Sequence, residues 1–228
     1  MLGGYNIQPL IECLKIDGLG SDAANALSKT LLIFDAFNEI FELANTNEHA
    51  KRVIDSWAEG TWFTEKPEIP DQIKLTVYKV PGEINTDDLS PATDAWSRPD
   101  IPLHALAMFK MPREGIERPL ETIDELKEKG NPLVFVGDVV GTGSSRKSAT
   151  NSVLWHMGDE IPCIPNKKEG GFCFGGKIAP IFFNTLEDSG AFPVECDVSQ
   201  LNMGQEIIFE PFNGKILDVD SGDVLSTF

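Results

Sequence analysis

Residues 133–149 read LVFVGDVVGTGSSRKSA, and this stretch decides the fold of the second part of the chain. It begins with a continuous apolar run at residues 133–136, which predicts a buried strand. Glycines and a polar cluster follow, and a helical pattern then runs from about Lys147 to Trp155. A strand that passes through a glycine-rich turn into a helix is typical of α/β domains.

The turn at residues 141–147 has the composition of an anion-binding site. Glycine permits a positive φ and lets a ligand approach the backbone closely. The free N–H groups and the dipole at a helix start favour negative charge. Ser144, Ser145, Arg146 and Lys147 add hydroxyl groups and positive charge at the same place. We therefore predict binding of a carboxylate or phosphate. Serines that only cap the helix are the alternative, which the sequence leaves open.

Three common glycine-rich motifs are weaker matches to this turn. The spacing lacks the last glycine of a dinucleotide fingerprint and the Gly-Lys-Ser ending of a P-loop. It also differs from the Gly-x-Ser-x-Gly of a nucleophile elbow.

The segments around the turn predict further strands and helices. Apolar and other side chains alternate over residues 73–78, which indicates a strand. Residues 119–128 predict an amphipathic helix that ends at Gly130. The dipeptide Asn213-Gly214 lies between apolar runs at 207–209 and 215–219, a strong hairpin signal. Two more apolar runs cover residues 178–184 and 191–194. This mixture predicts an α/β domain.

The N-terminal part predicts helices only. We expect a short helix at 7–14, a long one from about Asp22 with Ser21 as N-cap, and another at 46–58. Each of the last two has an apolar stripe at three- and four-residue intervals. The stripe residues are Leu27, Leu31, Phe34, Phe37 and Phe41 in one helix and Ala50, Val53, Ile54 and Trp57 in the other.

Residues 64–71, TEKPEIPD, separate the two parts. Two prolines and four charged residues make this stretch a plausible linker. We therefore predict two domains: an all-α, helical-repeat segment at 1–66 and the α/β domain at 67–228. No sequence repeat occurs within the first part, so the helical-repeat interpretation rests on its short helices.

The net charge narrows the classes of partner. The formal charge is −17, from 36 acidic and 19 basic residues. Such a charge disfavours general binding to nucleic acid or anionic membranes. No apolar run approaches the roughly 20 residues needed to cross a bilayer, and no export signal is recognisable. We expect a cytoplasmic protein.

The cysteines and histidines predict no metal site. Metal sites usually need closely spaced thiolates that converge on one ion. Here these residues are scattered, at Cys13, Cys163, Cys173, Cys196, His49, His104 and His156. Reduced thiols in the cytoplasm are the simpler interpretation.

Several motifs resemble the aconitase family. Residues 143–146, Gly-Ser-Ser-Arg, match the turn in the swivel domain of aconitases and isopropylmalate isomerases. Residues 85–92, NTDDLSPA, resemble an aconitase segment near the start of that domain. Residues 94–102 and 175–185 look like the bacterial aconitase B branch, in which a helical-repeat (HEAT-like) domain precedes the swivel domain. The resemblance covers nearly the whole chain.

The resemblance implies roles for individual residues. It makes Ser144 the catalytic base, which requires nearby positive charge and N–H dipoles to stabilise its alkoxide. Ser144, Ser145 and Arg146 would bind the substrate, and Arg98 would grip a substrate carboxylate. Asp87 matches an active-site acidic residue. No role is carried over to Asp88, because many relatives have histidine at that position.

The resemblance also implies a reaction, a cofactor and partners. The family interconverts citrate and isocitrate through cis-aconitate, and 2-methylisocitrate is a further candidate substrate. The family's 4Fe-4S cluster is held by three cysteines of other domains, so we expect no cluster ligands in this chain. The chain would therefore need the remaining domains of a longer enzyme for activity, and it would be inactive alone. Its helical segment would allow self-association.

Two alternatives are kept. One is the small subunit of an isopropylmalate- or homoaconitate-type isomerase, which shares the serine-serine-arginine turn but fits the helical segment and residues 94–102 poorly. The other is a regulatory or assembly module that binds RNA or protein. The acidic charge disfavours RNA binding by this chain.

Overall fold

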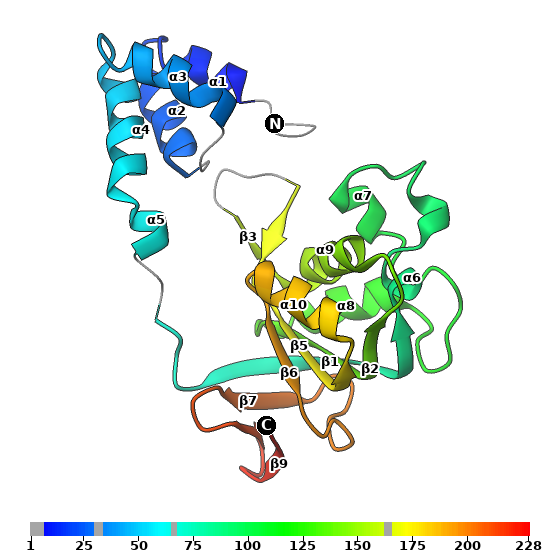
Figure 1. Cartoon of the computed structure of the whole chain (residues 1–228). Helices are drawn as coiled ribbons and strands as arrows, with labels where there is room; N and C mark the ends of the chain where they lie inside the picture. Colours follow the sequence, from blue (N-terminus) through cyan, green and yellow to red (C-terminus); the bar gives the residue numbers. More distant parts are fainter. Residues whose placement is uncertain (1–6, 30–33, 65–67, 162–165) are drawn as a thin grey trace. The chain divides into compact units, whose positions relative to one another are not determined.

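The computed structural model describes residues 7–29, 34–64, 68–161 and 166–228 (Figure 1). These residues form two compact units, and along the main chain the change from the first to the second falls between Ile69 and Pro70. The predicted boundary at 66/67 lies outside the described residues. Each unit is described by itself.

The first unit consists of helices. They are α1 (Gln8–Cys13), α2 (Gly20–Lys29), α3 (Phe34–Leu43), α4 (Glu48–Glu59) and α5 (Thr61–Thr64). The predicted helix at 46–58 is confirmed as α4, whose N-cap Asn47 accepts a 2.9 Å hydrogen bond from the N–H of Ala50. Its apolar stripe is largely buried, and the Trp57 indole N–H donates to the carbonyl of Leu27. Mutual burial therefore stabilises these short helices.

Two predictions for the first unit were wrong. Ser21 is no N-cap, because α2 already begins at Gly20 and includes it. The described residues of the predicted long helix also form two separate helices, α2 and α3. Leu27 of α2 is fully buried, whereas Phe41 of α3 is 54% exposed, so they do not share one buried stripe. Leu31 lies outside the described residues.

The second unit is built on a seven-stranded mixed sheet in the order β6-β5-β2-β1-β7-β8-β9. Four neighbouring strands are parallel: β1 (Ile73–Asn85), β2 (Leu133–Thr142), β5 (Phe172–Ile178) and β6 (Phe192–Glu195). Three antiparallel strands extend the sheet beyond β1: β7 (Glu206–Glu210), β8 (Lys215–Asp218) and β9 (Val224–Thr227). The predicted mixed α/β class is confirmed.

Helices and short strands connect the sheet. They are α6 (Thr86–Leu89), the 3₁₀ helix η1 (Ala92–Asp94), α7 (Ile101–Ala105), α8 (Pro119–Lys127), α9 (Arg146–Met157), α10 (Pro180–Asp188), and the paired strands β3 (Asp159–Glu160) and β4 (Lys168–Glu169). In Figure 1, α8, α9 and α10 lie on the same side of the sheet. Residues 143–145 connect the end of β2 to the start of α9.

The central strands are buried on both faces, which explains their apolar runs. Phe135 of β2 packs in the core under the helices, while Val134 and Val136 belong to a second core on the opposite face. Tyr78 of β1 is also fully buried, although simple alternation would place it outside. Burial raises the pKa of its hydroxyl.

The hairpin predicted around Asn213-Gly214 is confirmed as the antiparallel pair β7–β8. The predicted helices at 119–128 and after the serine cluster are confirmed as α8 and α9. The glycine-rich segment differs from the prediction, because β2 continues through Gly137 and Gly141 to Thr142. Gly137 pairs with both parallel neighbours, β1 and β5, whereas Gly141, with a φ of +81°, lies where the pairing of β2 with β1 shifts by one residue.

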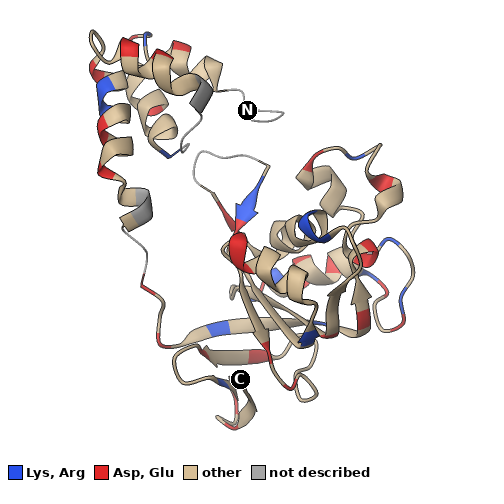
Figure 2. Ribbon diagram, viewed as in Figure 1, with Lys and Arg blue, Asp and Glu red and all other residues tan. Residues whose placement is uncertain are grey.

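The charged residues are spread over helices, strands and loops of both units (Figure 2). Among the described helices, none is long and apolar enough to cross a membrane.

Candidate active-site half at the carboxyl ends of β1 and β2

The parallel strands β1 and β2 end side by side, and this brings two polar segments together. Asn85, the last residue of β1, pairs with Thr142, the last residue of β2. Helix α6 follows β1, whereas residues 143–145 and then α9 follow β2. The backbone N–H of Ser145 donates to the Thr86 hydroxyl at 3.3 Å. Crevices at the carboxyl ends of parallel strands are common ligand sites.

Gly143 allows this close approach. Its φ is +110°, a conformation that L side chains rarely adopt. A Cβ atom at this position would lie 2.4 Å from the Thr86 hydroxyl oxygen and 2.6 Å from Asn85 Oδ1. Both distances are too short for a real contact, so glycine is required where the turn meets β1.

The start of α9 is uncapped. Ser145 occupies the N-cap position, but its side chain makes no capping hydrogen bond, and the first turn contains no acidic residue. The alternative that serines only cap this helix is therefore wrong for Ser145. Ser144 is exposed, and its hydroxyl has no hydrogen-bond partner among the residues that the structure describes. The free N–H groups and the helix dipole favour an anion here.

Arg146 folds back over the turn. Its Nη1 donates to the carbonyl oxygen of Gly143 at 2.7 Å, and its side chain is partly buried. This contact holds a positive charge beside Ser144 and Ser145. The structure thus brings three of the predicted site residues into one cluster.

The two aspartates of α6 have different surroundings. Asp88 accepts a 2.8 Å hydrogen bond from the backbone N–H of Asn85 and forms a 3.0 Å ion pair with Arg113. The first of these belongs to a capping box at the start of α6. Asp87 is exposed, and within the described part of the chain its carboxylate has no partner. Asp87 can therefore face a ligand, while Asp88 is occupied by structural contacts.

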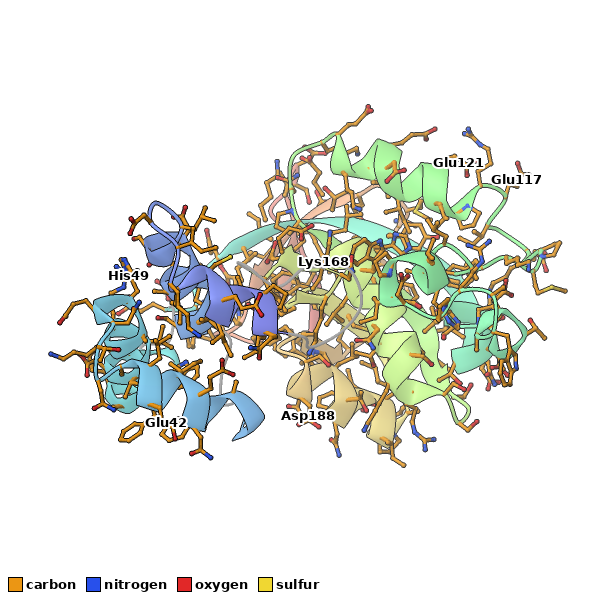
Figure 3. The ribbon with its side chains drawn as sticks, turned by 90° about the horizontal axis from the view of Figure 1, so that it is seen from above. Glu42, His49, Glu117, Glu121, Lys168 and Asp188 are labelled. Carbon is orange, nitrogen blue, oxygen red and sulfur yellow. The ribbon has the colours of Figure 1, made fainter. Side chains whose placement is uncertain are left out.

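Arg98 is not in contact with the Gly143–Arg146 turn among the described residues. Its Nε lies 3.4 Å from Asp94 Oδ1, and its Nη1 donates to the carbonyl of Leu103 at 3.1 Å. Arg98 instead lines an open groove of about 600 Å³ together with Lys110 and Arg113. Two acidic residues also line this groove and are labelled in Figure 3: Glu117, which precedes α8, and Glu121 in the first turn of α8.

Sequence reasoning missed three residues in this region: Asp94, Lys110 and Arg113. Besides Asp88, Arg113 binds the backbone carbonyls of Pro81 and Glu83, which no local pattern could reveal. Asp94 lies one helical turn before Arg98, and that i,i+4 spacing was an available signal.

The described cysteines do not fit a metal cluster. Burial raises the pKa of Cys173 to about 12 and also raises that of Cys196, so neither is activated as a thiolate by its protein surroundings. Within residues 7–29, 34–64, 68–161 and 166–228, no three His, Cys, Asp or Glu side chains are grouped to hold a metal. Cys163 lies outside these residues.

Comparison with known families shows the class of protein to which the chain belongs. Residues 75–228 match the family model described as "Aconitate hydratase 2 N-terminus", and residues 1–63 match the one described as "Aconitate B N-terminal domain". Together these models span both units. The sheet, with its Gly-Ser-Ser-Arg turn, therefore belongs to the aconitase class.

Individual relatives identify one family within this class. Over its whole length the chain is 63% identical to aconitate hydratase B of Synechocystis sp., 60% to that of Pseudomonas aeruginosa and 51% to that of Helicobacter pylori. The chain belongs to the aconitate hydratase B family. It spans only 26% to 27% of the length of these relatives.

A solved structure of a 3-isopropylmalate dehydratase from Methanocaldococcus jannaschii is also similar. It matches 67% of this chain, and 79% of its own length, with a TM-score of 0.49 and 18% identity.

Proposed function

We propose that this chain is the part of an aconitate hydratase that supplies the serine base and carboxylate-binding groups for interconversion of citrate and isocitrate through cis-aconitate. The observation that carries the proposal is the uncapped start of α9, where an exposed Ser144 lies beside Ser145 and Arg146. The names of the relatives support the same reaction. They favour it over the isopropylmalate-type small subunit.

In this proposal Ser144 removes a proton from the substrate carbon during dehydration and returns it during rehydration. A serine hydroxyl is a poor base in water, so its alkoxide needs a stabilising field. The dipole of α9 and the guanidinium of Arg146 supply positive potential at this point. Ser145 and Arg146 bind one substrate carboxylate, Arg98 binds another, and the exposed Asp87 faces the substrate.

The remaining domains of the enzyme complete the site. They hold the 4Fe-4S cluster, which in this family supplies a Lewis acid for the substrate hydroxyl. Exposed apolar side chains near Arg98 support such a composite site: Trp96 is 96% exposed and Met111 is 69% exposed.

The domain assignment is part of the same proposal. Residues 1–66 are the end of a HEAT-like helical domain, and residues 67–228 are the swivel domain. The division of the described residues near Ile69 supports this boundary. We place the protein in the cytoplasm, because its described cysteines, Cys13, Cys173 and Cys196, are free.

The proposal is tested by assaying cis-aconitate hydration with residues 1–228 alone and with the complete cluster-containing enzyme. We expect turnover only from the complete enzyme. Robust turnover by residues 1–228 would contradict the composite site. A complete enzyme that acts on another substrate but does not hydrate cis-aconitate would overturn the reaction, and dehydration of 2-methylisocitrate is the first alternative to assay.

Self-association through the helical segment is a second part of the proposal. Phe37 of α3 stacks on Phe41 and on Trp57, with ring centroids 5.7 and 6.2 Å apart. Phe37 is 37% exposed and Phe41 is 54% exposed, so the stack presents an apolar surface to solvent. Exposed aromatic clusters commonly anchor interfaces.

We predict that Phe37→Glu weakens self-association by at least about tenfold, because a carboxylate would be buried without a partner. Sedimentation velocity over a concentration series measures the change. Asn38→Glu adds the same charge at an exposed position of the same helix and serves as the control. Equal weakening by both variants would indicate a charge effect and not an aromatic interface.

A further inference from the structure

We propose that Asp94 is a positioning residue that holds the guanidinium of Arg98 in the orientation in which it binds a substrate carboxylate. This inference rests on the proposed function, because it assumes that Arg98 is a substrate ligand. It adds a residue that does not touch the substrate and acts only through Arg98.

Asp94 holds Arg98 at two places. Its backbone carbonyl accepts a 2.9 Å hydrogen bond from the Arg98 N–H, which closes a helical turn after η1. Its carboxylate Oδ1 lies 3.4 Å from Arg98 Nε. The first contact sets where the side chain leaves the backbone, and the second sets where the guanidinium ends. A long arginine side chain otherwise has many rotamers, so these contacts lower the entropy lost on binding.

The Asp94 carboxylate is itself fixed. The side chain is buried, and Lys110 Nζ lies 2.9 Å from one of its oxygens and 3.2 Å from the other. The Thr93 hydroxyl adds a further bond at 3.3 Å. The hydrogen bond from Lys110 is the main reason that the pKa of Asp94 lies below its usual range. The anchor is therefore a charged and immobile group at neutral pH.

Arg98 keeps its binding capacity in this arrangement. A guanidinium has five N–H donors. Nε faces the Asp94 carboxylate in the ion pair, and one donor on Nη1 binds the carbonyl of Leu103. The three others have no partner among the described residues, and together they can form the bidentate pair that suits a carboxylate.

The ion pairs of Asp94 leave an excess of positive charge beside Arg98, although Glu117 and Glu121 line the same groove. One carboxylate, Asp94, is shared by two cations, Arg98 and Lys110. This triad carries a net charge of +1. Asp94 therefore orients Arg98 without cancelling the positive charge that a substrate carboxylate needs.

The test compares Asp94→Asn with the unmodified complete enzyme. Simple electrostatics predicts tighter anion binding in this variant, because the triad gains one positive charge. Positioning predicts the opposite sign. We expect the KM for isocitrate and the inhibition constant of tricarballylate to rise about tenfold, with kcat within about twofold, since orientation of a non-reacting carboxylate affects ground and transition states alike.

Glu206→Gln is the matched control. It makes the same change of charge in the ion pair Lys74–Glu206 of β1 and β7, and we expect unchanged constants. Asp94→Asn should still fold, because Arg98 and Lys110 are 33% and 54% exposed and neither is left buried without water. Urea unfolding of both variants checks this point.

Arg98→Lys separates this inference from the proposed function. If Arg98→Lys leaves the KM unchanged, Arg98 is not a substrate ligand and that part of the proposed function fails. If Arg98→Lys raises the KM but Asp94→Asn leaves it unchanged or lowers it, only the positioning role of Asp94 is overturned. Positioning also requires that adding Asp94→Asn to Arg98→Lys has little further effect, and additive effects would overturn it too.

Discussion

Replacement of Ser144 by alanine is expected to lower the kcat of the complete enzyme by about 10³-fold, because a positioned general base contributes about that factor. The KM for isocitrate should change by less than about threefold, since Ser145 and Arg146 remain to bind the carboxylate. The Ser144 hydroxyl makes no hydrogen bond to any described residue, so its removal should not disturb the turn. Steady-state kinetics with isocitrate and with cis-aconitate measures both constants.

Ser145→Ala is the control for this prediction. It removes the neighbouring hydroxyl, which also makes no capping bond, and we expect a higher KM with a smaller loss of kcat. A loss of kcat below about tenfold in Ser144→Ala would place the base elsewhere. Asp87, the exposed carboxylate of α6, would be the next residue to test.

Gly141→Ala is expected to lower the free energy of unfolding by about 3 kcal/mol. Gly141 lies in β2 with a φ of +81°, so any side chain adds backbone strain. A Cβ atom would also lie 2.2 Å from Cγ of Phe182, whose ring is fully buried under the helices. That ring cannot move without disturbing the core. Urea unfolding followed by circular dichroism measures the loss.

Gly222→Ala separates the cost of backbone strain from the cost of the steric contact with Phe182. Gly222 has a similar φ of +75°, but a Cβ atom there would meet no atom within 4 Å. We therefore expect only the backbone strain, about 1 kcal/mol. Equal losses in both variants would show that the contact with Phe182 costs nothing, contrary to the packing described above.

Local patterns were sufficient for several elements. The apolar run before the serine cluster predicted β2, and the helical pattern after it predicted α9. The Asn213-Gly214 dipeptide predicted the hairpin β7–β8, whose loop spans residues 211–214, because turn residues and flanking apolar runs act within a few residues. Elements β5 and β9 were not predicted, since their short segments gain stability mainly from neighbouring strands.

Local patterns likewise predicted only part of the candidate site. Ser144, Ser145 and Arg146 could be predicted because one turn carries all three, and their roles remain predictions. The contacts of Arg98 with Asp94 and Leu103 were not predicted, nor was the ion pair of Arg113 with Asp88. The last of these joins residues 25 positions apart. A periodic pattern in the sequence gives no information on a contact between residues so far apart.

The glycine-rich turn before α9 shows what each level determined. The sequence by itself determined that a buried strand leads into a helix whose start carries serines and an arginine, because these features depend on neighbouring residues. Only the tertiary structure decided that β2 continues to Thr142, that Gly143 meets Asn85 and Thr86, and that Arg98 is held by Asp94 instead of by the turn. These features depend on parallel strand pairing and on side chains from separate segments, which act only after the chain has folded.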